Sequence, residues 1–572
     1  MRKAMGGFLL AGLLLHRPAM LAGNYADLTT LLPRWDFALL AAALILLEWE
    51  RLILLLKSLS RWSVAALLIL LLSALGHFFV NGYWTLESLG LNLAFLTIPL
   101  FGALNRDALR RLAPPFLCVF WLIDFLLTAG QWGFGKPLTG IAGNWNWNAT
   151  LLLVSVPFVC LWIIRKSRCR RAGWGLAGLA ALLSAFLIVC SGSRASLLAF
   201  AGAAGIGLFL FLPGRGRKIL LFSLLGVLLG GTALLTVGAP ERLDAFLKDE
   251  IRPVIWESTL ALIADHPLGV GAESFEEAYI PYKTAEYFFH RHAAWRTLHP
   301  HNEFLNIAAC LGIPALLGWC FLTFKGIGLF LLRFRKTRPE EKLIFFGFTV
   351  LLIHGMVDLV FAAWPLDLFA LLFAGFFWAP RMLGAEEDVK FHAIPRVAGV
   401  LALCGVLLSA GVNFAATRMY ETARKAVPGS APGRAELRAA ALTTAFPEAL
   451  YRAVESALLV RQDPRHALDL AGFFRDTPYR NMGRIHGFRA LALARLGRDA
   501  EALEEYRKDS ACYPYLLLPY VGQIGCLGRL GRTAEIPAVE KRLAEIMKIR
   551  GISRAGLLRI LQDPERDKPN SL

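Results

Sequence analysis

Long apolar segments separated by short polar loops dominate the first three quarters of the chain. A spanning helix needs about 20 mainly apolar residues, so 91–104 and 366–380 are the weakest candidates. The pattern predicts an all-α, polytopic membrane helix bundle with about 13 spans. The candidate spans lie at about 6–21, 37–56, 63–81, 91–104, 112–130, 147–164, 173–190, 194–212, 219–237, 303–331, 343–362, 366–380 and 397–417.

Basic residues in the loops indicate which side of the membrane each loop faces. With the N-terminus in the cytoplasm, the short cytoplasmic loops hold 24 Lys and Arg, against 4 in the short loops of the other face. Cytoplasmic loops are enriched in Lys and Arg, so this bias supports the expected topology. The first apolar run can alternatively be a signal peptide, and its removal would leave the sidedness unchanged.

The spans divide the chain into four regions. These are N-terminal spans (1–237), a large outer loop (238–302), C-terminal spans (303–417) and a polar tail (418–572). In the tail, the stretch Ala492–Tyr506 recurs 34 residues later as Cys526–Glu540, and Asp463–Phe474 is a weaker copy. A 34-residue period is typical of tetratricopeptide helical pairs. We therefore expect two to four helical hairpins, which could bind a protein partner.

The topology predicts opposite locations for two sites in the chain. Reporter fusions at Gly214 and Pro428 should show that the first is cytoplasmic and the second lies outside, because an odd number of crossings precedes the tail. Alkaline phosphatase activity at Gly214 and none at Pro428 would contradict the topology.

Composition narrows the class of protein. Of the 572 residues, 56% are hydrophobic and only 18% are charged, which is typical of a membrane protein. The net charge of +18 comes mainly from the loops that set topology, so we do not expect nucleic acid binding. The nine cysteines show no metal-ligand spacing, which argues against zinc. Cys512 and Cys526 are expected to be reduced core thiols.

Four segments distant in sequence bring polar residues to the outer membrane face. Because charged and polar groups near a membrane core are costly, their collection on one face indicates a functional site. The segments are "GNWNWN" (Gly143–Asn148, with Asn146 and Asn148), "SGSR" (Ser191–Arg194, with Ser193), the group His299, His301 and Asn302, and the pair His354 and Asp358.

Each segment also has a simpler interpretation. The Asn and Trp residues can be a helix cap and an interfacial belt, and Arg194 can be a membrane anchor. His354 and Asp358 can form a buried interhelical hydrogen bond. His299 and His301 lack a third ligand at metal-binding spacing, so a general base is the better interpretation of this pair. In the outer loop, the charge of Arg252 suits an anionic group at headgroup depth.

Three stretches, in order, resemble the signatures of a known family. They are "SGSRASLLAF", "RPVIWESTLALIADHPLGVGAESF" and "HPHNEFLNIAACLGIPALLGW". They are similar to the O-antigen ligase-like superfamily, which includes O-antigen polymerases and bacterial O-oligosaccharyltransferases. Asn146-Trp147-Asn148 stands where that family usually has Asn-Pro-Asn. The resemblance covers roughly residues 140–380.

The resemblance implies glycan transfer from an undecaprenyl-diphosphate carrier to an acceptor hydroxyl, on the periplasmic face of the bacterial inner membrane. The acceptor would be a lipid A core, a growing polysaccharide or a protein. His301 would be the base, with Asn302 beside it. Arg194 and Arg252 would hold the diphosphate in place of a metal, with Arg242 and Arg296 as weaker candidates and no cofactor.

Two other classes of protein remain alternatives. A transporter of lipid-linked glycan or polysaccharide would carry basic residues along several spans, whereas here they cluster at one face. A non-catalytic envelope assembly protein would act through its tail, and loss of His301 would then be harmless.

Overall fold

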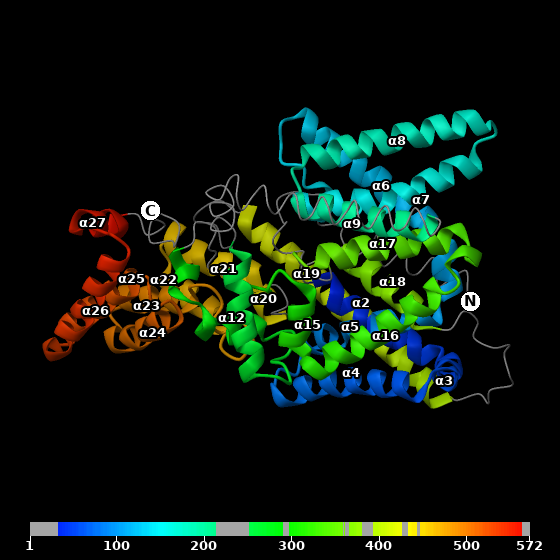
Figure 1. Cartoon of the computed structure of the whole chain (residues 1–572). Coiled ribbons are helices and arrows are strands. Elements are labelled where there is room, and N and C mark those ends of the chain that lie inside the picture. The colour runs from blue at the N-terminus through cyan, green and yellow to red at the C-terminus, as the bar shows by residue number, and fades with distance from the viewer. Residues whose placement is uncertain are drawn as a thin grey trace. The chain divides into compact units, whose positions relative to one another are not determined.

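The computed structural model describes residues 32–212, 251–289, 297–358, 360, 365–379, 393–425, 433–442 and 447–562. All regular secondary structure within these ranges is helical (Figure 1). The described residues form two compact units. The first comprises the described residues within Met1–Leu243, Pro267–Gly269 and His301–Val406, and the second those within Asp244–His266, Val270–Pro300 and Leu407–Leu572.

The first unit is a bundle of apolar helices. They are α2 (Leu32–Leu47), α3 (Trp49–Ser58), α4 (Arg61–Val80), α5 (Leu86–Leu104), α6 (Arg106–Gly133), η3 (Gly140–Ala142), α7 (Trp145–Lys166), α8 (Arg170–Cys190), α9 (Arg194–Phe211), α15 (Glu303–Leu311), α16 (Ile313–Leu331), η6 (Phe334–Lys336), α17 (Pro339–Gly355) and α18 (Leu366–Trp378). Helix α19 (Ala393–Lys425) begins in this unit and continues into the second.

Seven of the described helices, α4 to α9 and α16, are long and apolar enough to cross a membrane. Shorter apolar helices lie at Phe37–Leu47, Leu366–Trp378 and Ala393–Ser409. The chain is therefore a multi-pass, all-helical membrane protein. The expected spans 6–21 and 219–237 lie outside the described residues, so the total of about 13 stays a prediction.

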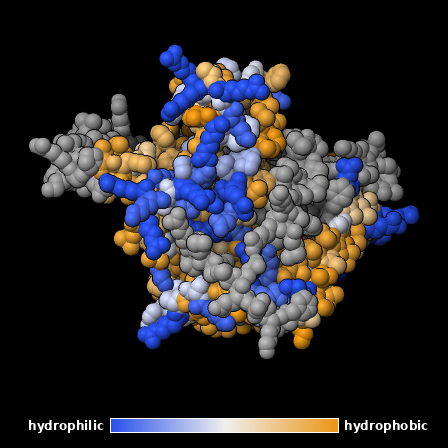
Figure 2. Space-filling model, turned by 90° about the vertical axis from the view of Figure 1, so that its right-hand side faces the viewer, coloured by the Kyte–Doolittle hydropathy of each residue, from blue (hydrophilic) through white to orange (hydrophobic). Residues whose placement is uncertain are grey.

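Many side chains on the outside of the bundle are apolar, as is typical of helices that face lipid. Leu72 of α4 and Leu182 of α8 expose most of their apolar surface, and Figure 2 shows further apolar side chains exposed around a hydrophilic centre. Helix α5 is mostly buried, and it packs against α2, α4 and α18. A Cβ atom at Gly102 would lie 2.7 Å from the Leu372 carbonyl oxygen, so glycine permits the close approach of α5 and α18.

Two expected spans are interrupted, which corrects the sequence prediction. The segment 37–56 breaks at Glu48, whose carboxylate forms an ion pair of 2.7 Å with Arg51. The segment 303–331 breaks at Gly312, which has a φ of +94°. A side chain there would collide with the Leu268 backbone, and the Ile313 N–H donates to the Pro267 carbonyl at 2.9 Å. Glycine is thus required where the Pro267–Gly269 segment meets α16.

The second unit combines helices of the outer loop with those of the tail. They are α12 (Arg252–Asp265), α13 (Phe275–Tyr279), η5 (Ile280–Tyr282), α14 (Ala285–Phe289), α20 (Gly433–Leu442), α21 (Pro447–Glu455), η7 (Ser456–Val460), α22 (Pro464–Gly472), α23 (Ile485–Arg495), α24 (Asp499–Cys512), α25 (Leu518–Arg529), η8 (Thr533–Glu535), α26 (Ile536–Ile549) and α27 (Arg554–Gln562).

Helices of the tail pack in chain order, each of α21 to α25 against the next. Gly497 and Gly531, 34 residues apart, end α23 and α25 with φ angles of +73° and +72°. The sequence repeat therefore corresponds to two helix–turn–helix pairs with similar turns. Assignment of these pairs to the tetratricopeptide class stays a prediction.

An aromatic cage joins the outer loop to the tail. The Lys283 ammonium lies 5.1 to 6.0 Å from the ring centroids of Tyr279, Tyr287 and Tyr513, and the lysine is buried. Cation–π contacts of this kind are strongest where water is excluded. Cys512, next to Tyr513, is a free thiol, as is Cys526, and burial raises the pKa of the Cys512 thiol to about 12. The two cysteines are thus not paired with each other in this structure, and their redox state stays a prediction.

Candidate functional site

His301 has an unusual backbone conformation in the first unit. It directly precedes α15 and has a φ of +52°, one of two positive values among the described residues that are not glycine. A left-handed conformation is uncommon for a residue other than glycine, although histidine adopts it more often than most, and residues held in it concentrate at functional sites. The conformation therefore singles out the same residue that the sequence predicted as the base.

Asn302 fixes the backbone on both sides of the site. Its side-chain Oδ1 caps α15 by accepting the N–H groups of Phe304 and Leu305 at 3.0 and 3.1 Å. Its Nδ2 donates to the Met356 carbonyl, just beyond the end of α17, at 2.9 Å. One side chain thus ties the start of α15 to the end of α17, and these three bonds all go to backbone groups.

A carboxylate lies between two histidines at this junction. His301 Nδ1 is 3.0 Å from Asp358 Oδ1, and His354 Nε2 is 3.9 Å from Asp358 Oδ2. Asp358 and His354 are buried, whereas the side chain of His301 is 34% exposed. An ionised carboxylate can only accept hydrogen bonds, so His301 Nδ1 is the donor and the basic lone pair of the ring is on Nε2.

The other face of His354 contacts a chain of buried hydroxyls. Its Nδ1 lies 2.5 Å from Thr150 Oγ1 of α7, which in turn lies 2.8 Å from Ser196 Oγ of α9. Ser196 also lies 2.7 Å from Ser193 Oγ and donates to the Asn146 carbonyl at 3.1 Å. The side chains of His354, Thr150, Ser193 and Ser196 are all buried, so their polar groups need these bonds.

Local sequence explains why α9 begins at this point. Gly192 adopts a φ of +68°, and Ser193 caps the helix by accepting the Ser196 N–H. The first helical residue is therefore Arg194, whose side chain is exposed. Arg252 is likewise the first residue of α12, in the second unit. Each arginine thus accompanies a helix N-terminus, where backbone N–H groups and the helix dipole favour anions.

The four predicted segments meet, but their residues differ in what they contact. His301, His354, Asp358 and Ser193 join one network, which Asn146 enters through its backbone carbonyl. Asn148 belongs elsewhere: its Nδ2 donates to Thr128 Oγ1 at 3.0 Å and to the Leu138 carbonyl at 2.9 Å. It therefore supports the segment before α7. Arg242 and Arg296 lie outside the described residues.

Comparison with known families identifies the central part of the chain. The family model described as O-antigen ligase matches residues 179–320. This stretch is similar to the O-antigen ligase domain, which supports the resemblance to the O-antigen ligase-like superfamily. The matched residues include Arg194, Arg252 and His301. No curated protein matches the chain, and no solved structure does.

The ligase match supports a membrane glycosyltransferase of the O-antigen ligase or polymerase type at the level of the family. Lipid-linked glycans are substrates consistent with that family. The network around His301 extends beyond the matched stretch of the ligase domain, since Thr150, His354 and Asp358 all lie outside residues 179–320.

Two residues of the network were not predicted from the sequence. Thr150 and Ser196 are single hydroxyls within apolar helices, where such residues commonly bond to their own helix backbone. A signal was nevertheless present. Thr150 follows Asn146 by four residues and Ser196 follows Ser193 by three, so each lies on the same helix face as a residue already singled out.

Proposed function

We propose that this protein transfers a glycan from an undecaprenyl-diphosphate carrier to an acceptor hydroxyl on the periplasmic face of the bacterial inner membrane. The observation that supports the proposal best is the bond between His301 Nδ1 and Asp358. It orients a partly exposed imidazole with Nε2 as its basic atom, directly before the start of α15. A group of this kind suits removal of a proton from a hydroxyl near neutral pH.

In the proposed reaction, the acceptor oxygen attacks the anomeric carbon of the glycan while its proton passes to His301 Nε2. The new glycosidic C–O bond forms as the bond between the anomeric carbon and the diphosphate oxygen breaks. Undecaprenyl diphosphate leaves with the bonding electron pair. The Asp358 carboxylate, 3.0 Å from Nδ1, stabilises the imidazolium that forms.

Arg194 and Arg252 are proposed to hold the diphosphate, without a metal ion. A guanidinium binds phosphate oxygens through two parallel hydrogen bonds, and charge-assisted bonds of this type are strong. Both arginines begin helices, so each guanidinium can act together with backbone N–H groups. Arg242 and Arg296 stay weaker candidates for the same role.

The acceptor is proposed to be a lipid A core, a growing polysaccharide or a protein hydroxyl, and the helical tail is proposed to bind a protein partner. Deletion of the gene distinguishes the acceptors, because each leaves a different product missing. Mass spectrometry of lipopolysaccharide, free polymer and glycoproteins from the deletion strain should show the loss of one class only. No change in any class would contradict the proposed transfer.

Asp358→Asn should lower the rate of transfer by the purified enzyme in liposomes that contain a lipid-linked glycan donor. Asparagine keeps an acceptor for Nδ1 but removes the charge that stabilises the imidazolium, so kcat should fall while KM changes little. The loss should be smaller than the about 10² to 10⁴-fold contributed by the base itself. Asp358→Glu should recover part of the rate.

Asp124→Asn is a matched control for this prediction. Asp124 is also a buried carboxylate of the first unit, and its Oδ1 accepts the Ile141 N–H at 2.8 Å, a bond that asparagine can keep. The control should retain transfer. Equal losses for Asp124→Asn and Asp358→Asn, or a change in KM alone, would contradict the role given to Asp358.

A further inference from the structure

A second polar site lies at the end of the bundle opposite the His301 network. A cavity of about 220 Å³ is lined by residues from the α3–α4 link, α6, α16, α17 and α18. Its lining includes Glu341 in the first turn of α17, whereas His354 lies in the last turn of the same helix. Thirteen residues of helix separate the two, or about 20 Å. The cavity is therefore distinct from the proposed catalytic site.

One end of the cavity presents a lysine within a candidate membrane span. Lys325 lies in α16, and its Nζ donates to Ser60 Oγ at 2.7 Å and to Ser63 Oγ at 2.8 Å. Within the described ranges, no carboxylate forms an ion pair with Lys325. An ionisable residue within a span is costly, which makes it a candidate for binding something of opposite charge. The two hydroxyls leave the lysine charge uncompensated.

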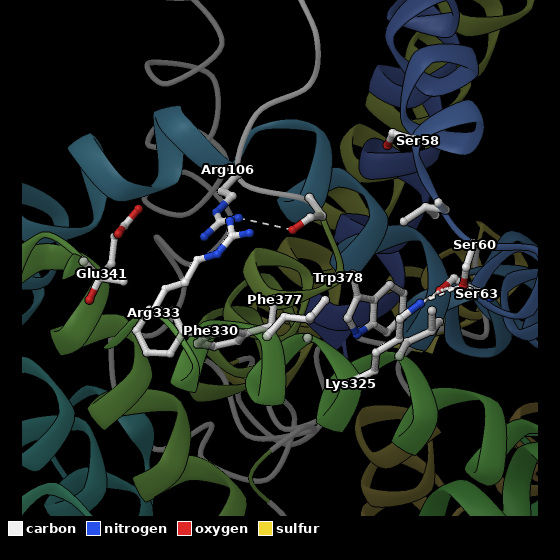
Figure 3. A pocket seen from close by; sticks show the side chains of 16 residues that line it. Ser58, Ser60, Ser63, Arg106, Lys325, Phe330, Arg333, Glu341, Phe377 and Trp378 are labelled. Atoms are coloured by element: carbon white, nitrogen blue, oxygen red, sulfur yellow. Dashed lines mark hydrogen bonds between the residues drawn. The ribbon is translucent and has the colours of Figure 1, made fainter. Parts of the chain in front are cut away.

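The other end of the cavity presents two arginines. Figure 3 shows the Arg106 and Arg333 side chains extending toward one another, with Lys325, Ser60 and Ser63 on the far side of Phe377 and Trp378. Arg106 donates to the Ala379 carbonyl at 3.2 Å and lies over the Phe376 ring. The lining thus has three cations and one carboxylate, that of Glu341. Like charges that approach one another favour an anion between them.

Apolar surface adjoins these cations. Leu329 of α16 lines the cavity and is 57% exposed, and Phe324 and Leu332 nearby are exposed as well. A free phosphate would use the cations but not this surface. An amphiphile uses both, because its charged head can enter the cavity while its chains lie along the helix.

We propose that this cavity binds the phosphate headgroup of an anionic phospholipid, whose acyl chains lie against α16. Basic pockets between membrane helices on the cytoplasmic side bind headgroups of this class. On the topology expected from the sequence, the cavity opens toward that side. A volume of about 220 Å³ is many times the ~10–15 Å³ that a cavity needs to hold one water molecule, so the cavity admits a phosphate with neighbouring polar atoms. The proposal does not depend on the glycosyltransferase function.

Native mass spectrometry of the purified full-length protein tests the proposal. The protein is mixed with equal amounts of phosphatidylglycerol and phosphatidylcholine, and bound lipids are counted. The wild type should prefer phosphatidylglycerol. The double variant Lys325→Gln/Arg333→Gln should reduce that preference by about 25-fold, since each basic group near a membrane surface contributes about fivefold. Glutamine at 325 can still bond to Ser60 and Ser63, so the change removes charge rather than packing.

Arg335→Gln is the matched control. Arg335 is an exposed cation two residues from Arg333 and is absent from the cavity lining, so its loss should leave the preference unchanged. An equal effect of Arg335→Gln would mean that the positive charge of the segment between α16 and α17 attracts anionic lipid without a specific binding site. Wild-type preference in the double variant would overturn the proposal. Thermal stabilisation of the wild type by inorganic phosphate, equal to that by phosphatidylglycerol, would assign the cavity to free phosphate instead.

A photoactivatable phosphatidylglycerol provides a second measurement that needs no variant. It should label wild-type peptides from the end of α16 and from the α3–α4 link, which both line the cavity. Excess unlabelled phosphatidylglycerol should remove the labelling, and excess phosphatidylcholine should not. Labelling that avoids these peptides would contradict the proposed site even if the double variant fails to fold.

Discussion

Replacing His301 with alanine is expected to reduce glycan transfer by about 10² to 10⁴-fold, the contribution of a positioned general base. The variant loses the imidazole but keeps the hydrogen bonds that join His354 to Thr150 and Ser196, and Asp358 stays 3.9 Å from His354 Nε2. Membrane insertion should therefore be normal. The measurement is transfer of a lipid-linked glycan by purified protein in liposomes, with elution on size exclusion as the test of folding.

Two neighbouring variants show whether the loss belongs to the base. His299→Ala should cost much less, because His299 lies before Pro300, two residues away from the proposed base. Asn302→Ala should fall between the two, because it removes the α15 cap and the bond to Met356, and a lost cap costs about 1 kcal/mol of stability. Loss of activity in His299→Ala with full activity in His301→Ala would mean that the base is misassigned. Full activity in both would favour the non-catalytic alternative.

Much of the site was predictable because membrane topology restricts where polar residues can go. The topology expected from the sequence puts the start of α7, the start of α9, the start of α15 and the end of α17 on one face. The polar residues at those four ends had to be neighbours in a compact bundle. His301, His354 and Asp358 therefore lie close together, as expected. The sequence does not indicate that Asp358 lies between the two histidines.

Features that depend on tertiary contacts were not predictable in the same way. The break at Gly312 exists because the Pro267–Gly269 segment contacts α16, and the apolar run through that position continues without interruption in sequence. The cation–π contact between Lys283 of the outer loop and Tyr513 of the tail likewise joins residues 230 positions apart. Asn148 was grouped with the site because it follows Asn146 by two residues, yet on a helix that spacing points the two side chains in different directions.

Arg194→Ala and Arg252→Ala are each expected to abolish transfer while the protein stays folded in the membrane. Without a cation, the negative charge that develops on the departing diphosphate is not stabilised, and such electrostatic stabilisation is often the largest single contribution to catalysis. Arg→Lys at either position should recover only part of the rate, because an ammonium is a point charge and cannot form two parallel bonds to phosphate oxygens. Transfer in liposomes measures the effect of each variant on the rate, and a separate binding assay measures its effect on the affinity for the donor.

Matched controls come from arginines remote from the proposed site. Arg168, in the link between α7 and α8, and Arg475, in the tail, are both exposed, so alanine at either position should leave transfer unchanged. Chelation by EDTA should also leave the purified wild type active, because the arginines take the place of a metal in this proposal. If EDTA stops transfer and a divalent cation restores it, the arginines are not sufficient for the leaving group. If Arg→Lys restores full activity, charge alone is required and the bidentate role is wrong.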